Sequence, residues 1–564
     1  MRELADLDVF IVDCQTTGAS PEHGAVLELG WGVARGGGGA LEHLQAHWIT
    51  LPEDAVVSAQ VRRLTGFDER RCAEPLAPEM AWQRMRACMD AATPMPAAIH
   101  FARFELAFLR DWALRFGAEA PFPLDAVCVH ALACRLYPNL PRRSLRALAG
   151  FLGHGVELER RCLGHVEATA FIWRRLCADL GERGVRTWPE LAAWLEARAP
   201  ASPRSSKRRY PLPSSRYRAL PDEPGVYRFL RSNGDVLYVG KARSLRKRVA
   251  SHFKSSGSTE HALEMLTQAN DVQVTTVPTP LEAALLENET IKALRPPYNV
   301  QLASHGQPAW FASPAFDSAV SAPDDAHRIG PLPSAFSLTA IGALIALLSG
   351  EAATRSLRAR SVGTADYWAP EAPIFVQGLA DFAARHLPAL PDRSRAEVQR
   401  ALFDAARKLV LAGKPGAKSE PEADPEELEP VAAPWDPERV ARHLERALAQ
   451  SYQLLRRARW LCLLYDSVIV YREPDRGRAR TLLIRQGEVV EARDTDAAEP
   501  LANTARVLQL RARKAAFDRA RYDRLRVLTT ELKRVRRDGG EVALYAACRR
   551  RISDAAVDAM LRLV

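Results

Sequence analysis

Apolar and polar positions in the first 190 residues follow two periods, one typical of strands and one typical of helices. The short apolar runs Val9–Val12 and Val26–Val33 predict strands, and the apolar positions between Phe104 and Trp112 recur at helical spacing. Strands and helices that alternate along a chain favour an α/β architecture. We therefore expect an α/β domain over residues 1–190.

A second, shorter pattern lies in the middle of the chain. Asn233-Gly234 separates two apolar runs and is a strong signal for a tight hairpin turn. Residues 244–253 and 281–294 carry apolar positions at helical spacing. A hairpin followed by two helices predicts a small α+β domain over residues 220–302.

The remaining segments are distinguished by composition and by weaker patterns. They are a basic Pro/Ser-rich linker at 201–219, a mostly helical region at 303–412, an acidic Pro-rich linker at 413–435 and an α+β region at 436–564. In the last region we expect a helix over 437–455, strands around 461–471 and 481–484, and two closing helices, one of them the basic segment 511–537. The fold class is therefore multidomain, α/β and α+β, as the length of 564 residues also suggests.

The net charge of +10 is concentrated in one part of the chain. Residues 201–260 carry 14 Lys and Arg against 4 Asp and Glu, an excess equal to that of the whole chain. A local basic segment of this kind is typical of proteins that bind a polyanion such as DNA. A solvated linker next to an ordinary basic helix is the alternative interpretation.

The cysteines and the apolar stretches narrow the class of protein further. The nine cysteines are irregularly spaced and include no C-x-x-C pair, which predicts neither a zinc site nor a disulfide framework and fits reduced thiols in the cytoplasm. The first residues lack an apolar signal core, and the longest apolar stretch, Leu338–Leu348, is too short to span a bilayer. We expect a cytoplasmic protein without a membrane segment.

Two tripeptides in the predicted hairpin carry the most specific signal. Gly225-Val226-Tyr227 and Tyr238-Val239-Gly240 stand ten residues apart, a basic run follows at 241–248, and the helix with Glu287 leads to Asn299. Each tyrosine alone would be interpreted as an ordinary strand residue. Together and in this order, the elements resemble the GIY-YIG endonucleases, in particular the N-terminal domain of UvrC and its stand-alone relative Cho.

The resemblance implies a role for each matched residue. Glu287 would hold a single divalent metal ion, Mg²⁺ or Mn²⁺. Tyr238 would act as general base on the attacking water, and Arg248 would stabilise the transition state. One carboxylate with one Mg²⁺ suits this metal, because Mg²⁺ keeps several of its waters.

The same resemblance implies supporting roles for four further residues. Tyr227 would complete the tyrosine pair of the hairpin, and Lys241 and Asn299 would support the site, with Lys241 in a turn after the second strand. His252 stands where UvrC proteins often carry Tyr, and a histidine there can still donate a hydrogen bond to a phosphate.

Three motifs in the first 190 residues resemble the DnaQ-like exonucleases, the DEDDh family of the polymerase III epsilon subunit, and imply an RNase H-like fold. They are Asp13-Cys-Gln-Thr-Thr-Gly18, Ile99-His-Phe-Ala-Arg-Phe-Glu105 and Arg160-Arg-Cys-Leu-Gly-His165. Against the family pattern, Gln15 replaces Glu, Glu105 replaces Asp, His165 takes the place of the last carboxylate and Arg160 that of the catalytic His.

These substitutions predict a degenerate exonuclease site. Only Asp13 and Glu105 remain of four carboxylates, and two dications close together need that negative charge. Arg160 cannot accept a proton from water at neutral pH. We expect little or no exonuclease activity, and the groove would either bind single-stranded DNA ends or dock on a partner.

The resemblance to UvrC fades beyond about residue 350. Gly330-Pro-Leu-Pro-Ser resembles the segment that follows the UvrC nuclease domain, but the sequence between 178 and 461 contains no cysteine cluster. The carboxylate motif of the second UvrC nuclease domain and the helix-hairpin-helix pattern are also missing. This favours a single incision, as in Cho.

The function expected from the sequence is a DNA-repair endonuclease of the nucleotide-excision type that cuts one strand of damaged or distorted DNA, with a damage-recognition excision-repair protein as a candidate partner. A 3′-to-5′ exonuclease in which the GIY-YIG domain mainly binds is one alternative. A non-catalytic DNA-binding adaptor is the other.

Overall fold

The computed structural model describes most of the chain. The described residues are 2–53, 55–69, 72, 74–89, 94–117, 121–156, 160–197, 208–254, 259–299, 309–351, 373–388, 394–412, 436–495, 517–546 and 551–563. They form two compact units, Met1–Ala283 with Ala293–Val300 and Ala284–Lys292 with Gln301–Val564. Among these residues, no helix is both long and apolar enough to cross a membrane.

The first unit begins with a five-stranded sheet in the order β3-β2-β1-β4-β5. Its strands are β1 (Asp8–Thr16), β2 (Val26–Arg35), β3 (Glu42–Trp48), β4 (Met95–Ile99) and β5 (Leu124–Cys128). The first three strands are antiparallel to one another, whereas β4 is parallel to β1 and β5 is parallel to β4. Both predicted strands and the predicted α/β class are confirmed.

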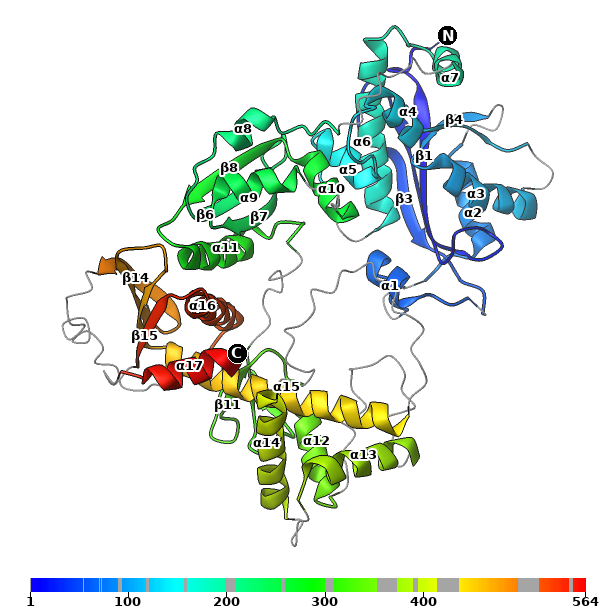
Figure 1. Ribbon diagram of the computed structural model, residues 1–564. Coiled ribbons are helices and arrows are strands. Elements are labelled where there is room, and N and C mark those ends of the chain that lie inside the picture. The colour runs from blue at the N-terminus through cyan, green and yellow to red at the C-terminus, as the bar shows by residue number, and fades with distance from the viewer. Residues whose placement is uncertain are drawn as a thin grey trace. The chain divides into compact units, whose positions relative to one another are not determined.

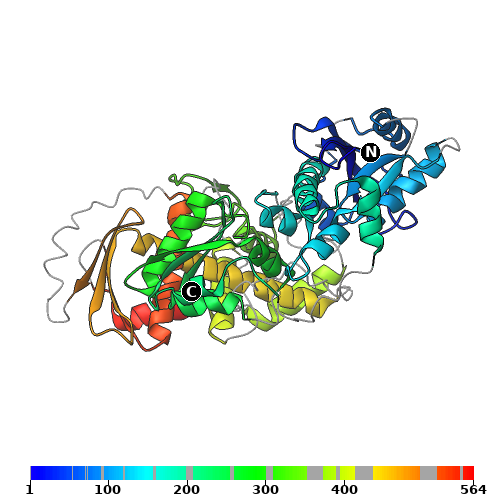
Figure 2. The ribbon, with the colours of Figure 1, turned by 90° about the horizontal axis from the view of Figure 1, so that it is seen from above.

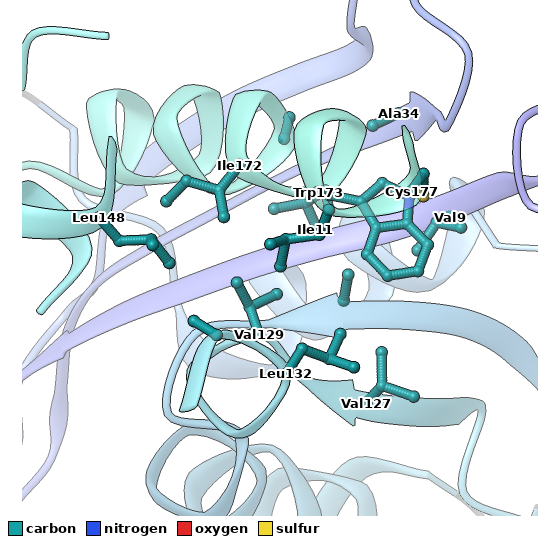
Figure 3. Close-up of a cluster of buried hydrophobic side chains, with 14 of the residues drawn as sticks. Val9, Ile11, Ala34, Val127, Val129, Leu132, Leu148, Ile172, Trp173 and Cys177 are labelled. Atoms are coloured by element: carbon teal, nitrogen blue, oxygen red, sulfur yellow. The ribbon is translucent and has the colours of Figure 1, made fainter. Parts of the chain in front are cut away.

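Helices cover both faces of this sheet (Figure 1). α2 (Pro78–Ala87) and α3 (Ala102–Phe116) contribute to one core, and α4 (Val129–Leu136), α5 (Leu145–Phe151), α6 (Cys162–Gly181) and α7 (Trp188–Glu196) contribute to the other. The short helix α1 (Ala59–Thr65) contributes to neither core. Successive residues of a strand point to opposite faces, and β1 follows this rule. Val9 and Ile11 pack with Trp173 of α6 on one face (Figure 3), whereas Phe10 and Val12 belong to the core on the other face.

A three-stranded antiparallel sheet in the order β7-β6-β8 follows. It consists of β6 (Gly225–Leu230), β7 (Val236–Ala242) and β8 (Asp271–Thr276), with α8 (Ser214–Arg218), α9 (Leu245–His252), α10 (Glu260–Gln268) and α11 (Pro280–Leu294) around it. Gly234 has a φ of 90° in the turn between β6 and β7, which explains the glycine there. The predicted hairpin and the two predicted helices are present, whereas α10 and β8 were not predicted.

The segment predicted as a basic linker, 201–219, is ordered in its second part. Leu212 is only 2% exposed and belongs to the core of the small domain. Tyr217 of α8 stacks on Phe253 with ring centroids 4.7 Å apart. Apolar side chains between the prolines therefore pack into the core of the small domain from about residue 210 onward. Residues 201–207 lie outside the described part.

The second unit contains a small sheet and a group of helices. The sheet has the order β10-β9-β11 and consists of β9 (Trp310–Ala312), β10 (Ala319–Val320) and β11 (Ile329–Leu332). The helices are α12 (Thr339–Leu348), α13 (Pro373–His386), α14 (Arg395–Leu411) and α15 (Pro437–Leu464). Figures 1 and 2 show α15 as one unbroken helix, and its buried residues share a core with α12, α13 and α14.

A four-stranded antiparallel sheet completes this unit. It has the order β14-β13-β12-β15 and consists of β12 (Ser467–Arg472), β13 (Ala479–Arg485), β14 (Glu488–Thr495) and β15 (Glu541–Ala546), with α16 (Arg519–Arg537) and α17 (Asp554–Leu563). The strand expected around 461–471 is helical up to Leu464, because Leu461 and Leu464 continue the buried face of α15. The acidic linker 413–435 and the start of the basic helix, 511–516, lie outside the described residues.

Candidate active site

The hairpin of β6 and β7 places the two motif tyrosines on one face of the sheet. Tyr227 lies opposite Gly240 in the antiparallel register, and Tyr238 lies opposite Phe229. Directly opposed residues share a face, so the two aromatic rings are neighbours, with centroids 6.0 Å apart. Tyr227 is buried and Tyr238 is partly buried.

The glycines of the two tripeptides are required for different reasons. A Cβ atom on Gly240 would lie 2.4 Å from Oη of Tyr227 and 2.8 Å from Cε1 of Tyr238. A Cβ atom on Gly225 would lie 2.3 Å from the backbone oxygen of Thr275 in the adjacent strand. Gly240 therefore gives space to the tyrosine pair, and Gly225 lets β6 and β8 approach.

His252, in the last turn of α9, contacts the tyrosine pair. Its Nε2 atom is 2.7 Å from Oη of Tyr227, a hydrogen-bond distance. Burial, and after it the positive charge of Arg248, lowers the pKa of His252 to about 4, so the imidazole is neutral at neutral pH. The sequence predicted a phosphate-binding histidine and missed this hydrogen bond to Tyr227.

Asn299 holds the strand that carries Tyr238. Its Oδ1 atom accepts a hydrogen bond from the backbone nitrogen of Val239, and its Nδ2 atom donates to the backbone oxygen of the same residue, both at 2.8 Å. The backbone nitrogen of Tyr298 donates to the oxygen of Leu237 at 3.1 Å. The segment 298–299 therefore fixes β7 on both sides of Tyr238.

The two cationic side chains of the motif are exposed. Lys241 lies within β7, not in a turn as expected, and Arg248 lies on α9. The positive charge of Arg248 acts on the pKa of His252, which places this guanidinium in the neighbourhood of the tyrosine pair. Both cations are accessible to a phosphate in solvent.

Glu287 lies in the middle of α11 and is partly buried. Further along the same helix, Glu289 pairs with Arg524 of α16 at 3.0 Å, and Lys292 pairs with the buried Asp523 at 2.8 Å. The α11 helix is thus held by α16 through two ion pairs after Glu287.

Three residues of the predicted degenerate exonuclease site form a second cluster of polar side chains, in the five-stranded domain. Asp13 is 7% exposed, and its Oδ1 atom lies 3.2 Å from Nδ1 of His165, while Gln15 donates to its Oδ2 atom at 3.0 Å. Burial raises the pKa of Asp13, but the adjacent imidazole and hydrogen bonds outweigh burial and leave this pKa below its usual value. The pKa of His165 is raised, because the Asp13 carboxylate outweighs the effect of burial.

The pKa of Glu105, the second remaining carboxylate, is shifted in the opposite direction to that of Asp13. Burial and the charge of Asp13 raise the pKa of Glu105 well above its usual value. Glu105 accepts hydrogen bonds from the backbone nitrogen of Cys14, at 2.9 Å, and from its thiol. The sequence missed this role of Cys14, which stands between the first two positions of the motif.

Arg160, the fifth residue of the predicted degenerate site, is exposed. Its positive charge lowers the pKa of His165, so the structure places it near the cluster. Glu167, two residues after His165, is exposed and acts on the pKa of His154. In the part of the chain that the structure describes, no three His, Cys, Asp or Glu side chains are grouped to hold a metal ion.

The comparisons with known proteins follow the same division of the chain. Residues 223–300 match the model of the UvrC-like GIY-YIG domain. UvrABC system protein C of Alkalilimnicola ehrlichii is 50% identical over 98 residues, which are 17% of this chain and 16% of that protein. A Mycobacterium tuberculosis protein named as a bifunctional exonuclease/endonuclease is 28% identical over 368 residues, 62% of this chain and 53% of that protein. The chain thus spans about half the length of this relative and a sixth of the other.

Two groups of solved structures are also similar. The GIY-YIG N-terminal endonuclease domain of UvrC from Thermotoga maritima, bound to its catalytic magnesium, is 35% identical, with a TM-score of 0.14, and covers 15% of this chain and 93% of that one. Exonuclease I of Escherichia coli in complex with a dA16 oligonucleotide is 14% identical, with a TM-score of 0.28. The match covers 39% of this chain and 48% of that one. Residues 223–300 of this α/β and α+β chain therefore match the UvrC-like GIY-YIG domain.

Proposed function

We propose that this protein is a metal-dependent DNA endonuclease that hydrolyses one phosphodiester bond in one strand during DNA repair, in the manner of a single-incision, Cho-like enzyme. The observation that carries the proposal is the tyrosine pair on one face of the hairpin, with Gly240 leaving space for both rings, inside a domain that matches the UvrC-like GIY-YIG model.

Hydrolysis of a phosphodiester needs a base for the water and positive charge for the phosphate oxygens. In its deprotonated form, Tyr238 would take a proton from the attacking water while the water oxygen bonds to phosphorus. The bond from phosphorus to the sugar oxygen would break, and the departing sugar oxygen would take a proton from solvent. Arg248 would stabilise the charge that develops on the phosphate. Lys241, exposed on the same strand as Tyr238, would attract the DNA backbone.

Glu287 would be the protein ligand of one divalent cation. Glu287 is a partly buried carboxylate on a helix whose neighbouring Glu289 is already paired with Arg524. A single carboxylate is enough for Mg²⁺ or Mn²⁺ in a site that also binds phosphate. When bound, the ion would supply Lewis acidity to the phosphate, and Glu287 would hold it.

Three residues would act by positioning. Tyr227 and His252 would fix the face on which Tyr238 works, through their 2.7 Å hydrogen bond. Asn299 would hold the backbone next to Tyr238. The substrate would be damaged or distorted duplex DNA, which the basic segment 201–260 attracts, delivered by a damage-recognition excision-repair protein.

The test is conversion of a supercoiled, ultraviolet-irradiated plasmid to the open circle in Mn²⁺ or Mg²⁺. The wild type should nick the plasmid, and Tyr238→Phe and Glu287→Gln should each slow nicking by at least 100-fold. Glu289→Gln is the matched control on the same helix and should nick normally. Equal nicking by Glu287→Gln and the wild type would contradict the proposal.

A 3′-to-5′ exonuclease activity is the second candidate. The relative named as a bifunctional exonuclease/endonuclease favours it, because the match extends over 368 residues. The contact of Asp13 with His165 argues against it, since an imidazole stands beside the carboxylate that a metal would need. Digestion of a single-stranded 3′ end that is lost in Asp13→Asn would establish this activity.

A further inference from the structure

The exonuclease-type domain and the GIY-YIG domain meet at two helices of the first compact unit, α5 and α10. A Cβ atom on Gly150 of α5 would lie 1.9 Å from Oε1 of Gln268 at the end of α10. The two helices are therefore in direct contact at Gly150. After α5, the backbone oxygen of Gly153 accepts a hydrogen bond from Asn233, in the turn of the GIY-YIG hairpin, at 3.4 Å.

A mostly buried polar cluster joins the two domains beside this contact. Arg146 of α5 pairs with Glu264 of α10 at 3.1 Å, with side chains 14% and 17% exposed. Ser144, which precedes α5, donates to the same carboxylate at 2.8 Å. The guanidinium of Arg146 lies 4.8 Å from the ring centroid of Tyr298.

Tyr298 connects this cluster to the GIY-YIG site. Its hydroxyl donates to Glu264 at 2.9 Å and accepts from Gln268, whose Oε1 atom accepts from Arg231 at 3.1 Å. Arg231 is buried and follows β6 directly at the hairpin turn. The cluster thus contacts both the turn of the hairpin and the segment 298–299.

The segment 298–299 is also what fixes β7 on both sides of Tyr238. Tyr298 donates its backbone nitrogen to Leu237, and Asn299 bonds both backbone groups of Val239. A continuous path of contacts therefore leads from Arg146, through Glu264 and Tyr298, to the strand of the proposed general base. Removal of one member of such a buried network leaves its polar neighbours without a partner, which costs free energy.

We propose that the exonuclease-type domain serves as a positioning partner of the GIY-YIG site, with Arg146 as the residue through which it holds Tyr298 and the strand of Tyr238. This inference rests on the proposed endonuclease function. It assigns the domain a task that does not depend on exonuclease chemistry. Arg146 is a positioning residue, because it acts on Tyr238 through Glu264 and Tyr298.

The experiment compares full-length Arg146→Met with Arg142→Met. Arg142 makes an exposed ion pair with Glu260 of the same α10 helix, at 2.7 Å, and is the matched control. Arg146→Met should lower kcat for plasmid nicking by 10- to 100-fold, while KM for DNA stays within threefold, because a small displacement of a reacting group lowers the rate without weakening binding. Arg146→Lys should recover part of kcat, since it keeps the positive charge beside Glu264.

A second readout does not need nuclease activity. Amide hydrogen exchange of β7, which includes the Val239 amide bonded to Asn299, should be at least tenfold faster in Arg146→Met and unchanged in Arg142→Met. A wild-type kcat together with wild-type exchange in Arg146→Met would overturn the inference. If the wild type does not nick DNA at all, the proposed function fails, and the exchange of β7 still decides whether Arg146 positions this strand.

Discussion

Gly240 is the residue whose replacement most directly tests the packing of the tyrosine pair. An alanine Cβ would lie 2.4 Å from Oη of Tyr227 and 2.8 Å from Cε1 of Tyr238, whereas ordinary contacts begin at 3.4 Å. One or both rings must therefore move by up to about 1 Å, and a misplacement of about 1 Å can slow a reaction by about 100-fold. The added methyl should also destabilise the fold by about 1–3 kcal/mol.

The assay is plasmid nicking under single-turnover conditions, together with urea denaturation of the same preparations. Gly240→Ala should remain folded and nick about 100-fold more slowly than the wild type. Gly181→Ala is the control, because an added Cβ at Gly181 meets no atom within 4 Å. Unchanged nicking by a folded Gly240→Ala protein would refute the argument that this glycine gives space to the catalytic face.

Three further predictions follow from the same structure. The pKa of His252 is about 4 in the folded protein, and its ordinary value is 6.5. Between pH 6.5 and 4 the imidazole is therefore protonated in the unfolded state and neutral in the folded state. The free energy of unfolding should therefore fall as the pH drops from 6.5 to 4. His252→Gln should reduce that loss by at most about 3 kcal/mol in urea titrations at pH 7 and 4.5. If the stability of the variant and that of the wild type depend equally on pH, the neutral, buried imidazole is excluded. His165→Ala should cost about 1–3 kcal/mol of stability at pH 7, because the buried Asp13 carboxylate then loses the imidazole beside it. His165→Ala combined with Asp13→Asn should recover part of this loss in denaturant titrations. Non-specific DNA binding by the basic segment 201–260 should weaken steeply with salt in fluorescence titrations, and a flat response would contradict that role.

The sequence predicted the parts of the site that depend on local order. The spacing of Tyr227 and Tyr238 around an Asn-Gly turn specifies a hairpin, and the period of 2 in a hairpin places both rings on one face. The helix after it was predictable from its apolar spacing and from Ser244, whose side chain accepts from Lys247 at the helix start. These features need no contact with remote segments.

What the sequence missed depends on contacts between distant residues. The bond between Tyr227 and His252 joins a strand to a helix, and the one between Tyr298 and Glu264 joins the end of the domain to α10. The sequence placed Leu461 in a strand, because the apolar residues around it fit the period of a strand as well as that of a helix. Packing of α15 against the other helices determines that this segment is helical.

The predicted degenerate exonuclease site also contains contacts that the sequence did not predict. The sequence predicted a loss of negative charge from the replaced residues. It did not predict that the imidazole of His165 would lie 3.2 Å from the Asp13 carboxylate. It also did not predict that Glu105, whose pKa is raised, would accept a hydrogen bond from the backbone nitrogen of Cys14. The loss of exonuclease activity and the domain boundaries stay predictions.

The most direct measurement uses a duplex with one bulky adduct, each strand end-labelled separately, incubated with the purified protein in Mg²⁺ or Mn²⁺. Wild type, Glu287→Ala and Asp13→Ala are compared. A single internal cut in one strand, lost only in Glu287→Ala, is the result that the account predicts. A ladder that shortens from the 3′ end and disappears in Asp13→Ala would contradict it, and the exonuclease fold would then be the catalytic one.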